Sequence, residues 1–227
     1  MPRTFFVTGT DTDAGKTFVT CVMLQAANEQ GLKTLALKPV AAGSDETSDG
    51  PRNADALNLM SAMNIKLSYS QVNPVLFEAP IAPHIAAQEE GRRITVDRLT
   101  GFCRGALMTR HDLSFIEGAG GWRVPLNDRE MLADLAKAMN LPVILVAGMK
   151  LGCISHSLLT VESILQSGCQ LAGWVANQVD PDMSRFQENV EALKQSIHAP
   201  CLGVVPWCSE QQAGDAVVSL DLSPLTV

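Results

Sequence analysis

The sequence lacks the features that would mark a membrane or nucleic-acid-binding protein. No apolar run in its 227 residues approaches the roughly 18 that a membrane-spanning helix needs. Basic residues are few, since 17 Lys and Arg stand against 24 Asp and Glu. The net charge of −7 argues against a nucleic acid or an anionic membrane as partner. The chain also has no internal repeat and no low-complexity block.

Metal-binding and export motifs are missing as well. The six cysteines include no C-x-x-C pair, and the four histidines form no H-E-x-x-H motif, so a zinc site is not indicated. From Met1 the chain runs directly into a strand-like segment, without the apolar stretch and small-residue cleavage site of a signal peptide. We therefore expect a cytoplasmic protein whose cysteines are free thiols.

What the sequence does contain is a regular alternation of short apolar runs and longer helical patterns. Strands are predicted at Thr4–Thr8, Thr34–Lys38, Leu113–Glu117, Val143–Ala147, Leu171–Ala176 and Leu202–Val205. Helices are predicted at Lys16–Glu29, Ala54–Met63, Val96–Thr109, Met131–Met139, Ser155–Ser167 and Ser184–Ile197. Several of the apolar runs are continuous, as in strands buried on both faces. This alternation predicts an α/β fold, a single domain over residues 1–227 with a parallel sheet covered by helices on both faces.

The strongest local signal is the segment Thr8–Thr17, TGTDTDAGKT. In the pattern G-x-x-x-x-G-K-[ST], the glycines let backbone amides wrap phosphate, the lysine reaches the terminal phosphates, and the hydroxyl meets Mg²⁺. Gly15, Lys16 and Thr17 fill the last three positions, whereas Gly9 lies one residue too early for the first. Because an apolar strand leads in and an apolar helix leads out, we interpret the segment as a P-loop rather than a chance Gly-Lys-Thr at a turn.

Charged side chains also stand at predicted strand ends, where parallel sheets place their ligand contacts. Lys38 ends a strand just before Pro39, and is either a ligand contact or a solvated lysine. Glu117 ends another strand before a glycine-rich turn, which makes it a candidate Mg²⁺ ligand. Asp55 is a second candidate carboxylate, although an acidic residue in a first helical turn also stabilises the helix regardless of function.

Three further segments follow predicted strands. Free amides from Gly152 to Ile154 would make an anion site for a carboxylate, whereas His156 is expected to pack. Asn177-Gln178 and Val204–Trp207 follow strands at the same sheet edge. An amide side chain offers both a donor and an acceptor to an adenine edge, although such residues are also common in ordinary loops. The polar stretch Gly43–Asn53 is expected to be an active-site loop rather than a domain linker.

Taken together, these motifs resemble the dethiobiotin synthetase family of P-loop NTPases. The matching segments keep their order and spacing along nearly the whole chain. They are Val7–Thr12, Gly15–Thr17, Lys38–Ala41, Gly50–Leu57, Val72–Pro74, Ala82–His84, Glu117–Trp122, Lys150–Ile154, Gly173–Asn177 and Pro206-Trp207.

This resemblance implies a homodimer whose subunits each have a Rossmann-like, mostly parallel sheet of seven strands. It implies ATP-dependent carboxylation and ring closure of 7,8-diaminononanoate with CO₂, giving dethiobiotin, ADP and phosphate in biotin synthesis. One amine would take up CO₂ as a carbamate, ATP would phosphorylate the carbamate, and the second amine would close the cyclic urea. Mg²⁺ would be the cofactor and ATP a co-substrate.

The resemblance also implies a role for each site residue. Lys16 and Lys38 would be the catalytic cations, and Mg²⁺ would be held by Thr17, Asp55 and Glu117. ATP would be bound by Asp13, Ala14, Gly15, Lys16, Thr17, Phe18, Asp55, Glu117, Gly118, Ala119, Gly120, Asn177, Gln178, Pro206, Trp207 and Cys208. The substrate would be bound by Thr12, Lys38, Ala42 (often serine in related sequences), Gly152, Cys153 and Ile154, the last three from the partner subunit.

Two other functions fit the same fold. A paralogous ligase would act on another diamine or carboxylate. A partitioning or septum-site ATPase typically carries an extra lysine early in the P-loop, where this chain has Asp11-Thr12-Asp13. The membrane-targeted members end in a basic amphipathic helix, whereas Val217–Pro224 contains no Lys or Arg. These features favour the ligase, and we expect Lys38→Ala to abolish synthesis without affecting the fold.

Overall fold

A parallel sheet forms the centre of the molecule in the computed structural model, which describes residues 3–207 and 220–226. Its strand order is β10-β9-β8-β1-β7-β2, and every neighbouring pair is parallel. The strands are β1 (Arg3–Gly9), β2 (Thr34–Leu37), β7 (Leu113–Gly121), β8 (Val143–Met149), β9 (Leu171–Gln178) and β10 (Cys201–Val205). All the predicted strands are present, and the α/β prediction is confirmed. The described residues place six strands in this sheet, one fewer than the family resemblance implies.

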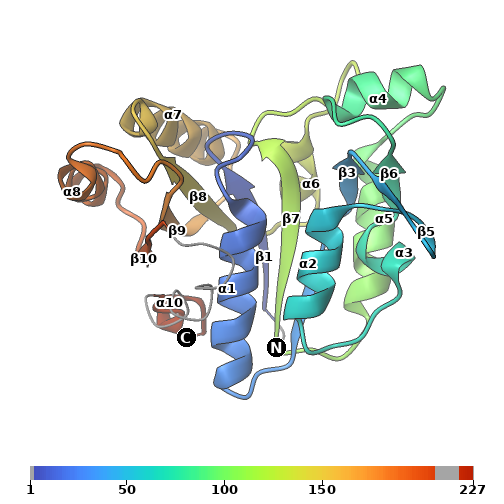
Figure 1. Ribbon diagram of the computed structural model, residues 1–227, viewed down its shortest axis with the longest axis horizontal. Helices are drawn as coiled ribbons and strands as arrows, with labels where there is room; N and C mark the ends of the chain where they lie inside the picture. Colours follow the sequence, from blue (N-terminus) through green and yellow to red (C-terminus); the bar gives the residue numbers. More distant parts are fainter. Residues whose placement is uncertain (1–2, 208–219, 227) are drawn as a thin grey trace.

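Helices cover both faces of the sheet. They are α1 (Lys16–Glu29), α2 (Ala54–Ala62), α3 (Tyr69–Val72), α4 (Pro83–Glu89), α5 (Val96–Leu107), α6 (Leu132–Ala138), α7 (Cys153–Gln166), α8 (Phe186–Ser196) and α10 (Ser223–Thr226). Figure 1 shows α1 and α2 in front of the sheet and α6 and α7 behind it. The long helices agree with the prediction. Helices α3, α4 and α10 were not predicted; the four residues of α3 and of α10 are too few for a helical period to show.

Two small sheets lie beside the central one. Pro39 offers no backbone N–H, so the chain leaves the central sheet after β2 and pairs β3 (Val40–Ala42) with β6 (Val75–Phe77). The polar stretch Gly43–Asn53, expected to be an active-site loop, forms an antiparallel hairpin of β4 (Asp45–Thr47) and β5 (Gly50–Arg52), and its last residue, Asn53, lines the cavity of the candidate site. Its turn is closed locally, because the Thr47 hydroxyl donates to the Gly50 carbonyl at 2.6 Å.

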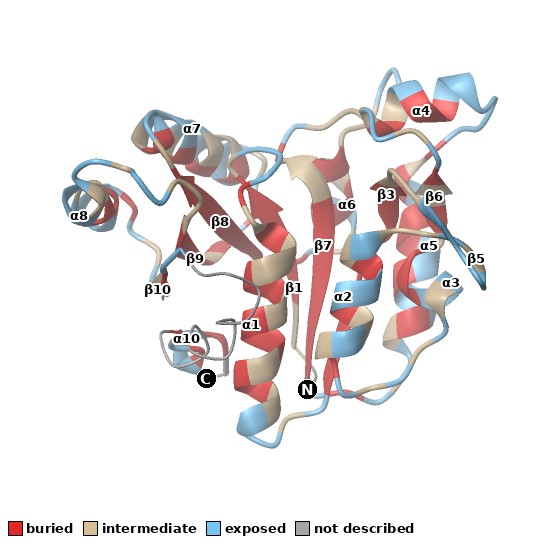
Figure 2. Ribbon diagram, in the orientation of Figure 1, coloured by how far each residue is buried: buried red, intermediate tan, exposed pale blue. Residues whose placement is uncertain are grey.

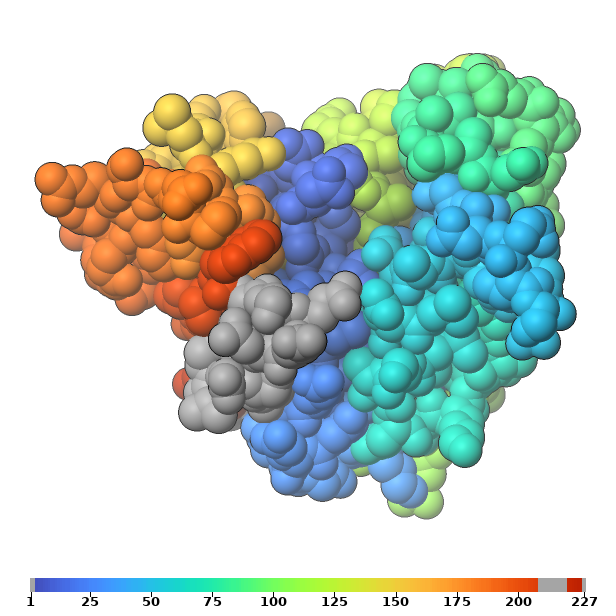
Figure 3. Space-filling view, in the orientation of Figure 1, coloured from blue at the N-terminus to red at the C-terminus, as the bar shows by residue number. Residues whose placement is uncertain are grey.

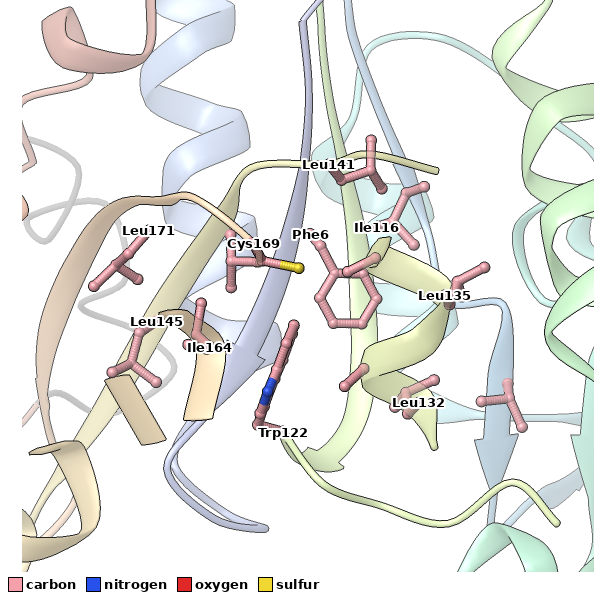
Figure 4. Packing of buried hydrophobic residues seen from close by; sticks show 14 of the residues in the cluster. Phe6, Ile116, Trp122, Leu132, Leu135, Leu141, Leu145, Ile164, Cys169 and Leu171 are labelled. Atoms are coloured by element: carbon pink, nitrogen blue, oxygen red, sulfur yellow. The ribbon is translucent and has the colours of Figure 1, made fainter. Parts of the chain in front are cut away.

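The core divides into two layers because successive strand residues point to opposite faces. In β1, Phe5 and Val7 join the layer under α1 and α2, whereas Phe6 joins the opposite layer. Figure 2 shows the central strands mostly in red, the colour of buried residues. In the second layer the ring of Trp122 stands edge-on to Phe6, with 6.0 Å between ring centroids (Figure 4). Each such large side chain contributes roughly 1.5–3 kcal/mol by leaving water.

Two further observations concern membrane-spanning helices and the state of the cysteines. No helix within the described ranges is long and apolar enough to cross a membrane. The five cysteines that the structure describes are free thiols, and Cys208 lies outside the described residues. Burial raises the pKa of the Cys103 thiol to about 12, so this cysteine behaves as a small apolar core residue.

Candidate active site

The segment between β1 and α1 forms a tight turn that is held by a side chain from β9, two strands away from β1 in the sheet. Gly15 has φ of 80°, and Asp13 adopts the left-handed region with φ of 59°, which is uncommon for a residue with a side chain. The amide of Asn177, at the end of β9, donates to the Ala14 carbonyl at 3.0 Å. A Cβ on Gly15 would overlap this amide, so the contact requires glycine. The turn is therefore held rigidly at the start of α1.

Lys16 lies almost buried at this turn, with 7% of its surface exposed. Its ammonium donates to the backbone carbonyl of Asp11 at 3.2 Å. Burial lowers the pKa of Lys16, and the nearby ammonium of Lys38 lowers it further. The carboxylate of Asp11 in turn accepts from the Thr12 amide and pairs with Lys150 at 3.3 Å.

The most concentrated group of charges gathers around Lys38, just beyond β2. Its ammonium donates to Glu117 Oε1 at 2.6 Å and to Asp55 Oδ2 at 2.9 Å, and also to the Gly118 carbonyl at 3.2 Å. The Thr17 hydroxyl donates to the same Glu117 Oε1 at 2.6 Å. Four elements therefore meet here: α1 supplies Thr17, β7 supplies Glu117, α2 supplies Asp55 in its first turn, and Lys38 follows β2.

Burial and pairing together set the charges of this group. The Glu117 side chain is fully buried, and that of Lys38 is 4% exposed. Burial by itself would lower the pKa of Lys38, but the two carboxylates outweigh it and raise that pKa. Burial would likewise raise the pKa of Asp55, but Lys38 outweighs it and lowers that pKa. Lys38 and Asp55 are therefore a charged pair at neutral pH.

A cavity of about 560 Å³ lies against the turn and the charged group. Most of the predicted phosphate and substrate contacts line it, namely Thr12, Asp13, Gly15, Lys16, Thr17, Phe18, Lys38, Ala42, Asp55, Ala119 and Gly120. Figure 3 shows the N-terminal part of the chain, in blue, at the surface of the molecule between the cyan-to-green and orange parts. The carboxyl ends of parallel strands thus lie at a cavity that Lys16 and Lys38 both line.

Comparison with known proteins shows which family uses this arrangement. A family model described as an AAA domain matches residues 3–213. An ATP-dependent dethiobiotin synthetase from Cellvibrio japonicus is 56% identical, covering 98% of this chain and 97% of its own. Proteins with the same description from Pseudomonas paraeruginosa and Marinobacter nauticus are 51% and 48% identical, each over 98% of this chain. The chain belongs to the dethiobiotin synthetase family.

Solved structures more distant than the dethiobiotin synthetases share only the fold. The septum site-determining protein MinD of Pyrococcus horikoshii, solved with Mg-ADP, has a TM-score of 0.56 at 15% identity and covers 96% of this chain and 86% of its own. A ParA family ATPase from Chlorobium tepidum has a TM-score of 0.57 at 12% identity, over 96% of this chain and 90% of its own. At such identities the likeness confirms the P-loop architecture and carries no function.

The segment Gly152–Ile154, expected to bind the tail of the substrate, does not line the cavity of the same chain. Gly152 is the N-cap of α7 with φ of 96°, and its neighbour Leu151 is 95% exposed. The amide of Cys153 donates to the Lys150 carbonyl at 2.9 Å, so it is not free for a ligand. Gly152, Cys153 and Ile154 are all absent from the lining of the cavity that Lys16 and Lys38 line.

The residues expected to hold the nucleotide base gather at the ends of β9 and β10. The side-chain oxygen of Gln178 accepts from the Trp207 amide at 3.2 Å, and Trp207 is 55% exposed. Pro206 is exposed beside it, and Asn177 connects this edge to the P-loop turn through Ala14. Cys208, also predicted here, lies outside the described residues.

Several residues that line the cavity were not predicted as site residues. Asn53 caps α2 by accepting from the Ala56 amide, and its own amide donates to the Gly43 carbonyl at 2.9 Å. A second group, Pro80–Pro83, lies in the segment that leads into α4, and Val124 lies in the turn after β7. Asn53 lies in the predicted polar loop and in a segment that resembles the family, and Ala82 and Pro83 lie in another such segment. Pro80, Ile81 and Val124 are apolar loop residues, which carry no chemical signature in a sequence.

The side chains expected to hold Mg²⁺ suit that ion. Among the described residues there is no group of three or more His, Cys, Asp or Glu able to hold a metal, so any site here has only two carboxylates. Thr17, Asp55 and Glu117 supply oxygen donors, and Mg²⁺ is usually held by one or two carboxylates together with phosphate and water. Glu117 Oε2 is buried and has no hydrogen-bond partner in the described structure, which leaves one carboxylate oxygen available for a ligand.

Proposed function

We propose that this protein forms dethiobiotin, ADP and phosphate from 7,8-diaminononanoate, CO₂ and ATP. The observation that carries this proposal is the 56% identity, over 98% of this chain, to a protein described as an ATP-dependent dethiobiotin synthetase. The chemistry consists of three steps. One amine adds to CO₂ and loses a proton to give a carbamate; a carbamate oxygen then attacks the γ-phosphorus of ATP and expels ADP. Finally the second amine attacks the carbamoyl carbon, closes the ring and expels phosphate.

The arrangement of the lysines supports this sequence of steps. A carbamate and a triphosphate are both anions, so they repel each other unless positive charge lies between them. Lys16 and Lys38 both line the same cavity, and the ammonium group of each donates hydrogen bonds to protein oxygens that hold it in place. Charges that are already oriented before reaction stabilise a developing anion at little reorganisation cost, which is usually the largest catalytic effect.

Thr17, Asp55 and Glu117 would hold Mg²⁺ in this proposal. The ion would supply charge that neutralises the phosphates as the phosphoryl group moves. The turn from Asp13 to Phe18 would cradle the phosphates with backbone amides at the start of α1, and Ala119 and Gly120 line the same cavity.

Other residues that line the cavity suit the diamine. Thr12 and Lys38 offer polar contacts, whereas Ala42 offers only a methyl group. The side chains of Ile81, Ala82, Pro83 and Val124 present an apolar surface along which a hydrocarbon chain can lie. Asn177, Gln178, Pro206 and Trp207 would hold the base of ATP at the edge beside the P-loop turn.

The tail carboxylate of the substrate would be bound by a second subunit. The backbone amides of Gly152 and Ile154, at the start of α7, lie outside the cavity of their own chain, which supports a homodimer in which each chain completes the site of the other. The same proposal places the reaction in the cytoplasm, where the described free thiols would persist.

The test is to incubate purified protein with diaminononanoate, bicarbonate and MgATP, and to measure phosphate and dethiobiotin together. We expect both products in equal amounts and dependent on the diamine. Phosphate release that does not respond to the diamine would reject the proposal. A panel of other diamines and carboxylates separates it from a paralogous ligase, because turnover on another acceptor alone would favour that enzyme.

A further inference from the structure

We propose that the Lys38 ammonium and a divalent cation are alternative occupants of the carboxylate pair formed by Asp55 and Glu117. Binding of the cation then displaces Lys38 into the cavity, where its charge becomes available to the acceptor substrate. The inference rests on the assignment of the metal ligands under the proposed function. It adds to the proposed function a competition between two cations for the same carboxylates. The divalent cation must therefore bind before Lys38 can reach the acceptor substrate.

The contacts of Lys38 show why the two cations compete. Its ammonium takes Glu117 Oε1 at 2.6 Å, Asp55 Oδ2 at 2.9 Å and the Gly118 carbonyl at 3.2 Å, so three oxygens surround one positive charge. Two of these oxygens belong to the carboxylates that a divalent cation would use. The ammonium therefore lies between the metal ligands rather than beside them.

Electrostatics requires one cation at this place and disfavours two. Glu117 is fully buried, and a buried carboxylate without a positive partner is strongly disfavoured. Lys38 supplies that partner in the structure. A divalent cation bound by the same two carboxylates would repel an ammonium held within hydrogen-bond distance of them. Binding of one therefore favours departure of the other.

The backbone on either side determines where the displaced ammonium can go. The backbone amide of Lys38 donates to the Val72 carbonyl at 2.9 Å, and the Lys38 carbonyl accepts from the buried side-chain amide of Asn73 at 2.6 Å. These bonds hold the main chain, so only the side chain can move. The cavity that also contains Lys16 lies directly against it. Cation binding thus moves Lys38 toward the substrates.

The first experiment measures binding of Mn²⁺ alone, as free Mn²⁺ by electron paramagnetic resonance, to protein without nucleotide. Lys38→Met removes the internal competitor, so we expect its Mn²⁺ affinity to rise on the order of tenfold to a hundredfold over wild type. Lys150→Met is the matched control, because Lys150 also pairs with a carboxylate at this sheet edge, that of Asp11 at 3.3 Å. Equal affinity in wild type and both variants would overturn the proposal.

The location of the ion is tested in the same assay. Adding Asp55→Asn to Lys38→Met should remove the gain in Mn²⁺ affinity, because one of the two shared carboxylates is lost. A gain that survives this change would place the ion elsewhere and overturn the proposal.

A second measurement uses wild-type protein and so does not depend on a stable Lys38→Met. Lysine labelled with ¹³C at the ε-carbon gives one signal for Lys38, assigned by its loss in Lys38→Arg. We expect this signal to move when Mg²⁺ alone is added at concentrations that fill the Mn²⁺ site. A signal that stays in place would overturn the exchange, whereas diamine-independent phosphate release would reject only the proposed reaction.

Discussion

At the scale of single residues, the pair of Lys38 and Glu117 links stability to catalysis. The two side chains are 4% and 0% exposed, and their charged atoms lie 2.6 Å apart. A buried pair of this kind adds little net stability, but removal of one partner leaves the other charge without compensation. The expectation from sequence that Lys38→Ala leaves the fold unaffected therefore needs revision.

We predict that Lys38→Ala lowers the free energy of unfolding by about 3–5 kcal/mol. Turnover should fall by about 10²–10³-fold or more, because an oriented charge is lost from the site. The double variant Lys38→Ala/Glu117→Gln should recover much of the stability but none of the activity, since the uncompensated charge is gone. Urea denaturation and phosphate release measure the two effects. Equal stability of the single and double variants would contradict the argument.

The pair of Lys38 and Asp55 predicts a pH dependence of stability. The folded pKa of Asp55 lies below its ordinary value of 3.8, so the stabilisation is present above that value and is lost as the pH falls through the lower folded pKa. The folded pKa of Lys38 lies above its ordinary value of 10.5, so the stabilisation persists below that value and is lost as the pH rises through the raised folded pKa.

Urea unfolding of wild type and Asp55→Asn at a series of pH values tests this dependence. The difference in unfolding free energy between the two proteins should be constant between about pH 5 and pH 9, and should shrink below about pH 4. A difference that grows in acid would show that Asp55 is stabilised as the neutral acid instead.

At the scale of elements, the turn before α1 is held by contact with β9 as well as by its own backbone. Gly15 and Gly31 have nearly the same backbone angle, φ of 80° and 77°. A Cβ on Gly15 would overlap the Asn177 amide, whereas one on Gly31 would meet none of the described atoms within 4 Å. The two glycines therefore separate the effect of a left-handed conformation from the effect of a contact.

We predict that Gly31→Ala costs about 1 kcal/mol of unfolding free energy, because only the backbone angle is disfavoured. Gly15→Ala should cost about 1–3 kcal/mol more, since Asn177 must give up its buried bond to the Ala14 carbonyl. It should also weaken binding of a non-hydrolysable ATP analogue, whereas Gly31→Ala should not. Thermal unfolding and calorimetric titration measure these effects. Equal losses of stability in the two variants would refute the contact with β9.

At the scale of the whole molecule, the proposed site is shared between two copies of the chain. Ile154→Pro removes one backbone N–H from the first turn of α7, a position where proline is tolerated. Neither Ile154→Pro nor Lys38→Ala should turn over the diamine by itself. When the two variants are mixed and allowed to exchange subunits, about a quarter of wild-type turnover should return, because half of the dimers are mixed and each carries one intact site. Activity that stays absent after exchange would contradict a shared site, and sedimentation measures the dimer directly.

The elements of the fold could be read from local pattern. The apolar runs predicted every strand of the central sheet, because strands of a buried parallel sheet have no polar face to obscure their composition. The pattern also predicted α1 with its observed bounds, Lys16–Glu29. It could not predict the β4–β5 hairpin, because three-residue strands on a polar surface have no hydrophobic period. The short helices were missed for the same reason.

The sequence by itself determined the kinds of chemical group in the site and the strand ends at which they stand, because those depend on residue type and short spacing. Only the tertiary structure decided which groups touch. Lys38 and Glu117 are 79 residues apart in the chain, and Asn177 and Ala14 are 163 apart. Such contacts follow from the order of strands in the sheet, which brings β2 beside β7 and β9 near β1. That order is set by packing of the whole core and leaves no local trace in the sequence.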